Sequence, residues 1–121
     1  MSTTPTTTAT PLTDAQYRQQ TDAVLARIEA TIDRWLQEDV IDIDTQRAGG
    51  LLELSLSGPH GASKLIVNTQ PPLHELWLAA RGGGFHFKFV DGAWRDTRDG
   101  VEFFARLAEH ASLQAGQQLS F

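Results

Sequence analysis

The sequence predicts a two-layer α+β sandwich, in which an antiparallel sheet of about six strands carries an N-terminal and a C-terminal helix on one face. Three observations predict this fold class: a long amphipathic segment near the start, several short segments of period-two hydrophobicity in the middle, and a second amphipathic segment near the end. Clean alternation favours antiparallel strands with one buried face and one solvent-exposed face. Both helices are therefore expected to cover the buried face.

The first helix has a clear start signal. Residues 1–12 are rich in Thr and Pro and are expected to form a disordered tail, so that one domain covers residues 13–121. Thr13 and Gln16 fit a capping box, and Leu12 and Tyr17 are placed as its hydrophobic staple. The helix is predicted to run to about residue 36. Its buried stripe repeats every 3.6 residues and consists of Tyr17, Val24, Ile28, Thr31, Ile32 and Trp35.

Six strands and a final helix are expected after the first helix. Alternating patterns bounded by Gly, Pro and Asp residues predict strands at 40–45, 52–57, 64–68, 74–79, 85–89 and 93–97. The Asp91-Gly92 pair predicts a hairpin turn. Asp99 is expected to cap a helix over about 101–111, with Glu102 at the capping-box position. Residues 113–121 then form a tail with scattered apolar side chains.

Composition limits the classes of function. The 121 residues suffice for one domain with a core, and no apolar run is long enough to span a membrane. Cysteine is absent, which excludes disulfides, thiolate metal sites, cysteine nucleophiles and cysteine-held iron–sulfur clusters within this chain. The N-terminus has neither the pattern of a secretory signal nor that of an Arg-rich transit peptide, so a cytoplasmic location is expected.

The negative charge is concentrated in the first third of the chain. Residues 14–46 contain eight acidic and three basic side chains, whereas residues 47–121 contain seven of each. An acidic surface attracts cations and basic partners and repels nucleic acid. We therefore expect no nucleic-acid partner.

Seven carboxylates are predicted to form one acidic surface. Asp22, Glu29 and Asp33 fall within about 40° of one another on a helix, Glu38 and Asp39 follow at its end, and Asp42 and Asp44 share one face of the first predicted strand. Carboxylates suit hard cations such as iron(III) and, less selectively, Mg, Ca and Mn. Exposed carboxylates bind metals weakly when no other groups orient them. The alternative is an ordinary solvated helix face.

The fourth predicted strand presents a tryptophan to the opposite face from its leucines. Leu76 and Leu78 are expected to face the helices, and Glu75 and Trp77 to face water. A large aromatic side chain on a solvated face often marks a partner site, whereas the alternative is that Trp77 lies against a loop or the tail. The histidines form no HExxH motif and no i,i+4 pair, although His74 could add a weak metal contact.

Polar and aromatic residues recur in a definite order in the middle of the chain, as the run N-T-Q-P-P-L-H-E-L-W-L, then G-G-F-H-F, then a Trp after an Asp-Gly turn. In this order the sequence resembles the frataxin family, specifically its bacterial branch, over roughly residues 14–121. The matching positions are Asn68, Gln70, Pro72, Trp77, Leu78, Gly83 and Trp94. The resemblance implies the same sandwich fold, and iron-binding carboxylates on the first helix and the next strand. Glu29, Asp33, Asp42 and Asp44 match acidic positions of the family, whereas Ala30, Arg34 and Leu36 stand where bacterial relatives often carry acids.

The resemblance also implies a function. It indicates an iron-binding protein of iron–sulfur cluster assembly, which acts as an iron donor or as a regulator of the complex between a cysteine desulfurase and a scaffold protein. Iron(II) and iron(III) would bind weakly on the acidic surface, and Asn68, Gln70 and Trp77 would dock on the assembly machinery. A monomer that iron can drive into oligomers is expected. The alternative is a ferroxidase, but redox carboxylate sites are usually buried in helix bundles with Glu-x-x-His ligands, and that motif is absent.

Overall fold

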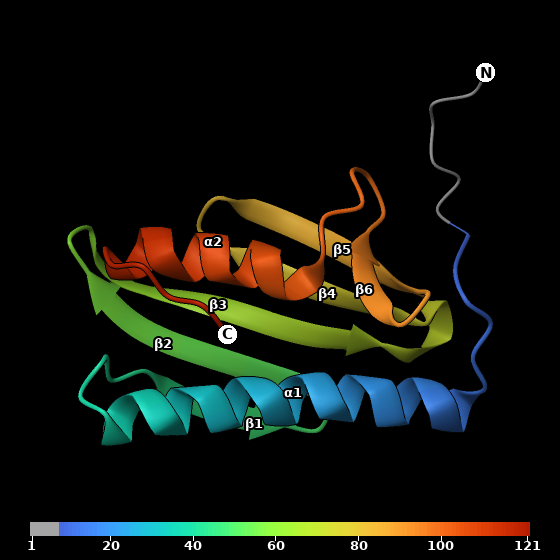
Figure 1. The fold of residues 1–121 in the computed structure, drawn as a ribbon, viewed down its shortest axis with the longest axis horizontal. Coiled ribbons are helices and arrows are strands. Elements are labelled where there is room, and N and C mark those ends of the chain that lie inside the picture. Colours follow the sequence, from blue (N-terminus) through green and yellow to red (C-terminus); the bar gives the residue numbers. More distant parts are fainter. Residues whose placement is uncertain (1–7) are drawn as a thin grey trace.

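The computed structural model describes residues 8–121 as two helices packed on one face of a six-stranded antiparallel sheet (Figure 1). The sheet order β1-β2-β3-β4-β5-β6 follows the chain, so each strand pairs with the next one. The predicted fold class is confirmed. The elements are α1 (Asp14–Gln37), β1 (Asp44–Ala48), β2 (Leu51–Gly58), β3 (Gly61–Gln70), a 3-10 turn η1 (Pro71–Leu73), β4 (Glu75–Ala80), β5 (Gly83–Val90), β6 (Ala93–Asp96) and α2 (Phe103–Ala115).

Helix α1 begins where its capping box predicts. The Thr13 hydroxyl accepts a hydrogen bond from the Gln16 backbone N–H at 3.1 Å, and the Gln16 side chain accepts one from the Thr13 N–H at 2.9 Å. These reciprocal bonds satisfy two of the donors that a helix start leaves free. The predicted buried stripe is also confirmed, and it is widened by Thr21 and Leu25.

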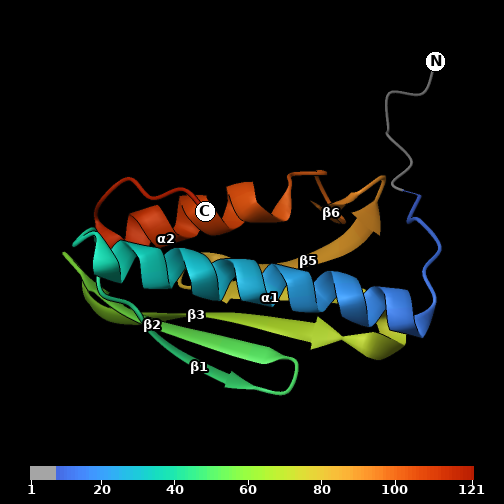
Figure 2. The ribbon, with the colours of Figure 1, turned by 60° about the horizontal axis from the view of Figure 1, so that its bottom comes forward.

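The core lies between the helices and the sheet face that they cover. Figure 2 shows α1 and α2 side by side over that face. Leucines at alternate positions of β2 and β4 point into it, and Phe87 of β5 packs edge-on against Phe103 of α2 with 5.1 Å between ring centroids. Tyr17 joins the layers, because its hydroxyl donates to the Glu75 carbonyl at 2.6 Å and accepts from the Gln70 N–H at 2.9 Å. The other sheet face carries no helix and is called the open face below.

The first predicted strand is misplaced. Residues 40–45 were expected to form it, but β1 begins at Asp44 and ends at Ala48. The apolar residues that produce the alternation, Ile41 and Ile43, pack against the core from a connecting segment that has no strand partner. Val40 N–H bonds to the Trp35 carbonyl at 2.8 Å, which folds this connection against the end of α1. Asp42 therefore lies in the connection, and only Asp44 belongs to β1.

The last helix also differs from the prediction. Glu102, not Asp99, is its N-cap, because the Glu102 carboxylate accepts from the N–H groups of Phe104 and Ala105. Asp99 instead accepts from the Val101 N–H at 3.1 Å in the loop before the helix. The helix continues to Ala115, where Gly116 ends it in a left-handed conformation with φ of 72°.

The segment before α1 contacts the sheet. Thr10 N–H donates to the Phe89 carbonyl at 2.8 Å, and the Thr10 hydroxyl accepts from the Asp91 N–H at 2.9 Å. Leu12 packs against the core. The predicted disordered tail over 1–12 therefore overlaps residues that contact the domain, and its first seven residues lie outside the described part of the chain. Within residues 8–121, no helix is long and apolar enough to cross a membrane.

Candidate functional site

The acidic surface is divided by an arginine of β1. Arg47 Nη1 lies 2.8 Å from Glu29 Oε1, and Arg47 Nη2 lies 3.4 Å from Asp22 Oδ1. These contacts join α1 to the edge of the sheet. Glu29 is therefore closely paired with a fixed cation and Asp22 more loosely, so a metal ion at these two carboxylates would have to compete with Arg47.

The other five carboxylates of the acidic surface extend from the end of α1 to β1. Asp33, Glu38, Asp39, Asp42 and Asp44 are all exposed. Glu38 has a long contact of 4.0 Å with Arg34, in which both side chains are mostly exposed. Asp44 and Asp42 line a shallow groove with Lys64 on the neighbouring strands. No three acidic or histidine side chains among residues 8–121 are arranged to hold one metal ion together. Such exposed, separated ligands favour weak binding of hard cations with little selectivity.

The predicted docking residues lie on the open face. Cross-strand pairing places Asn68 of β3, Trp77 of β4 and His86 of β5 in one row. The indole of Trp77 stacks on the His86 imidazole with 4.1 Å between centroids and 6° between ring planes. Trp77 is half-buried instead of fully exposed, because this histidine covers one side of its ring. The row thus crosses three strands, with the two stacked rings on β4 and β5 and the Asn68 amide beside them on β3.

Glu75 lies beside this row, two residues before Trp77 on the same strand and the same face. It was expected to face water, and it does lie on the open face, but only 8% of its surface is exposed. Trp77 Nε1 donates to Glu75 Oε1 at 2.7 Å, and Lys88 Nζ lies 3.1 Å from Glu75 Oε2. Burial alone would raise the pKa of the Glu75 carboxyl, but the hydrogen bonds from Trp77 and Lys88 outweigh it and lower the pKa below its usual value. The carboxylate thus fixes the orientation of the indole.

Sequence reasoning missed His86 and Lys88 as members of this surface. Gln70 was predicted, and pairing places it beside Glu75, which in turn pairs with Lys88 of β5. The sequence did not give the register between β4 and β5. Alternation along one strand gives the sheet face of a side chain, but it does not give the residue opposite on the neighbouring strand. His86 shares the parity of Lys88, opposite to the buried Phe87, so the alternation of β5 is the signal that could have placed both side chains on this face.

His74 does not join the acidic surface. Its Nε2 lies 2.9 Å from Asp14 Oδ1 at the start of α1, and its ring stacks on Tyr17 with 4.7 Å between centroids. It has a left-handed backbone with φ of 50°, which is uncommon for a residue with a Cβ atom. Its expected weak metal contact would therefore be made beside Asp14.

These features define a small α+β protein with two candidate binding surfaces, an exposed acidic surface along α1 and β1 and an ordered polar and aromatic row on the uncovered sheet face. The chain belongs to the frataxin-like family, because the family model described as a frataxin-like domain matches residues 10–117.

Relatives of known name and structure support that membership. The iron-sulfur cluster assembly protein CyaY of Paraburkholderia xenovorans strain LB400 is 47% identical over 110 residues, which are 91% of this chain and 98% of that protein. The CyaY protein of Burkholderia mallei strain SAVP1 is 48% identical over the same shares. The solved frataxin of Psychromonas ingrahamii superimposes with a TM-score of 0.76 at 32% identity, over 90% of this chain and 97% of that one. Trimeric yeast frataxin complexed with ferrous iron has a TM-score of 0.60 at 23% identity over 91% of this chain and 92% of that one, and it supports the fold alone.

Proposed function

We propose that this protein acts in iron–sulfur cluster assembly as an iron-binding partner of a cysteine desulfurase and its scaffold protein. The observation that carries the proposal is the match to assembly proteins at 47% and 48% identity over 98% of their length. The row Asn68–Trp77–His86 supplies a docking surface that suits such a role. The protein would bind and regulate without turnover of its own.

Iron would bind on the part of the acidic surface that Arg47 does not occupy. Asp33, Glu38, Asp39, Asp42 and Asp44 are exposed oxygen ligands from the end of α1, the connection and β1. Hard oxygen donors suit both iron(II) and iron(III), and the absence of a three-residue cluster within residues 8–121 favours low affinity. The same carboxylates would attract a basic surface of the desulfurase.

The open face would dock on the assembly complex through Asn68, Gln70 and Trp77. An aromatic side chain that is fixed before binding loses little conformational entropy on binding, so it is a good anchor. Trp77 meets this condition, because His86 covers one side of its ring and Glu75 holds its N–H. The role of iron donor and that of regulator both use this surface.

The ferroxidase alternative has less support. Iron oxidation at paired carboxylates needs ligands that converge on one metal centre, usually within a helix bundle. Here Asp22 and Glu29 pair with Arg47, and the other acidic residues are spread over three elements. Repeated oxygen consumption with added iron(II) would support the ferroxidase instead.

An NMR titration of the full chain tests the proposal. With iron(II), broadening is expected around Asp33, Asp42 and Asp44, while Trp77 Nε1–H is unaffected. With the desulfurase, the Trp77 and Asn68 signals are expected to change. Asp33→Asn should reduce the response to iron, and Asp91→Asn in the β5–β6 turn is the matched control.

A separate variant tests the docking part of the proposal. Trp77→Ala should weaken desulfurase binding by at least about 2 kcal/mol, as anchor residues do, while the iron response of the acidic surface persists. Desulfurase binding that remains unchanged in Trp77→Ala would remove the docking part of the proposal. An iron response spread evenly over all carboxylates, Asp91 included, would remove the iron part.

A further inference from the structure

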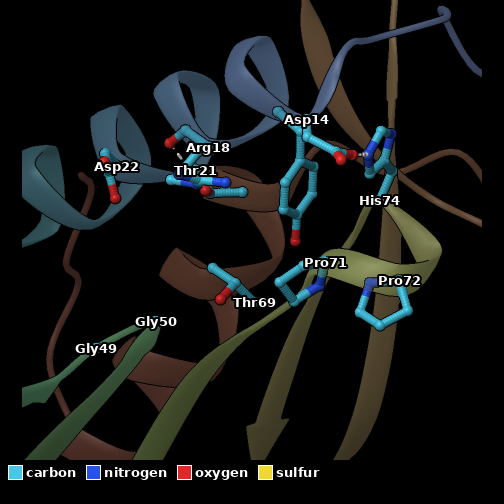
Figure 3. A pocket seen from close by; sticks show the side chains of 11 residues that line it. Asp14, Arg18, Thr21, Asp22, Gly49, Gly50, Thr69, Pro71, Pro72 and His74 are labelled. Atoms are coloured by element: carbon cyan, nitrogen blue, oxygen red, sulfur yellow. Dashed lines mark hydrogen bonds and ion pairs between the residues drawn. The ribbon is translucent and has the colours of Figure 1, made fainter.

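A pocket of about 500 Å³ lies beside the first half of α1, away from the open face and the exposed half of the acidic surface. Figure 3 shows that α1 forms one wall and that Gly50, Thr69, Pro71 and Pro72 lie across from it. Pockets that hold small molecules typically measure about 300–1,000 Å³ and combine apolar walls with a few polar groups.

Arg18 supplies a positive charge at this pocket, and its guanidinium forms no ion pair with another side chain of residues 8–121. Asp14 and Asp22 stand four residues before and after Arg18 on α1, where helical neighbours normally pair. Each aspartate instead contacts another group, since Asp14 lies 2.9 Å from His74 Nε2 and Asp22 lies 3.4 Å from Arg47 Nη2. Within residues 8–121, the Arg18 guanidinium therefore lacks a carboxylate partner.

The chemistry of the lining selects the charge of a ligand. A guanidinium binds a carboxylate through two parallel hydrogen bonds. Asp22 Oδ1 makes only the long contact with Arg47, so this carboxylate can also accept from an ammonium group. Two aspartates beside one arginine disfavour a phosphate or another dianion. A ligand with one negative and one positive group matches this arrangement.

The uncharged residues of the pocket determine which side chain a ligand can carry. The rings of Pro71 and Pro72 offer an apolar surface, and Tyr17 is buried beneath. The shape of the pocket is fixed at the β1–β2 turn, because a Cβ atom on Gly50 would lie 2.0 Å from Thr69 Oγ1. Position 50 therefore favours glycine, and the Thr69 N–H holds the turn against β3 by donating to the Gly50 carbonyl at 2.9 Å.

We propose that this pocket binds a free α-amino acid with a small apolar side chain. Its carboxylate pairs with Arg18, its ammonium group with Asp22, and its side chain lies against Pro71 and Pro72. The site is separate from the proposed iron and docking surfaces, so its existence does not depend on the proposed function.

The test is an NMR titration of the full chain with L-valine and with two probes that each lack one charge. Isovalerate keeps the carboxylate, and isobutylamine keeps the ammonium group. L-valine is expected to shift the Gly50, Thr69 and Arg18 Nε–H signals saturably, and each single-charge probe should bind at least tenfold more weakly. Arg18→Gln should weaken L-valine binding at least tenfold, whereas Arg34→Gln on the same helix is the matched control and should not.

A second variant separates the two charges. Asp22→Asn should weaken L-valine binding and leave isovalerate binding unchanged or stronger, because a negative charge near the carboxylate is removed. Equal binding of isovalerate and L-valine would show a simple carboxylate site and overturn the assignment. The absence of saturable shifts with L-valine would overturn it as well, provided that the spectrum of the unliganded protein shows the folded chain.

Discussion

The two proposed binding surfaces are built in different ways. On the open face, Trp77 is held by His86, by Glu75 and, through Glu75, by Lys88. On the acidic surface, Asp33, Asp42 and Asp44 are exposed and make no side-chain hydrogen bond or ion pair with the rest of residues 8–121. The first surface is ordered before any partner arrives, and the second is a distribution of charge.

This difference predicts how each surface responds to change. An ordered surface depends on particular contacts, so single substitutions should affect its affinity strongly and salt should affect it little. A distribution of exposed charge acts over a distance, so it should influence the association rate and respond to salt. The four predictions that follow test this contrast.

The largest expected effect separates the core from the open face within one strand. Leu76 is fully buried, so Leu76→Ala should lower the free energy of unfolding by about 2–5 kcal/mol. Trp77→Ala should cost roughly 1 kcal/mol, because the indole is half-buried on the uncovered side. Urea denaturation of both variants measures the difference. A larger loss for Trp77→Ala would mean that the indole belongs to the core.

The second effect concerns the support of the open face in acid. The pKa of the folded Glu75 carboxyl lies below its ordinary value of 4.5, so its charge stabilises the fold above that pH. This stabilisation is lost as pH falls through the folded pKa. Glu75→Gln should therefore be less stable at neutral pH and lose less stability below pH 4.5 than the parent. Thermal unfolding across this pH range checks it.

Glu53→Gln is the matched control for Glu75. Glu53 also lies on the open face and contacts a lysine, with 3.2 Å between its Oε1 and Lys64 Nζ, but it lacks a tryptophan donor. It should change the pH dependence less. An equal change in both variants would mean that Glu75 has no special role in ordering Trp77.

A smaller effect is expected for the acidic surface in association with the desulfurase. Asp33→Lys or Asp42→Lys should slow association several-fold at low salt and leave dissociation nearly unchanged. The effect should fade at physiological ionic strength, where screening acts over about 8 Å. Stopped-flow or surface-based kinetics at several salt concentrations measure it, with Asp91→Lys as the control. A purely faster dissociation would indicate direct, close contacts instead.

The smallest effect lies within the acidic surface itself. Glu29→Gln removes a 2.8 Å ion pair with Arg47 and should lower stability by about 0.5 kcal/mol. Asp33→Asn removes a charge near the negative end of the helix dipole and should leave stability unchanged or raise it by about 0.3 kcal/mol. Chemical denaturation at low salt compares the two. Equal changes would mean that Arg47 does not distinguish these carboxylates.

Much of the fold followed from local patterns. The capping box at Thr13 and the stripe from Tyr17 to Trp35 are confirmed, since both depend on residues within a few positions of one another. The alternation of β4 placed Leu76 and Trp77 on the correct faces. Residues 40–45 were wrongly predicted as a strand because Ile41 and Ile43 alternate, although they pack against the core without a partner strand. Periodicity reports burial and not hydrogen-bond pairing.

The site residues depended on long-range contacts that local patterns do not contain. Arg47 contacts Glu29, which is eighteen positions earlier in the chain. The stack of Trp77 on His86 needs the β4–β5 register. Glu75 was expected to be exposed because parity gives a face, whereas its burial comes from the side chains of Trp77 and Lys88 above it. These details require the assembled sheet.

The order of the strands also bears on how the chain folds. Because each strand pairs with the one that follows it, most pairings close only a short loop, and the entropy cost of closure is small. The docking of the helices is different, since it joins Tyr17 to Glu75 across 58 positions. We therefore expect the β3–β4 pairing to form early and the α1 contact to form late. Destabilising substitutions in the pairing should slow refolding, and Tyr17→Phe should mainly speed unfolding, which stopped-flow kinetics would distinguish.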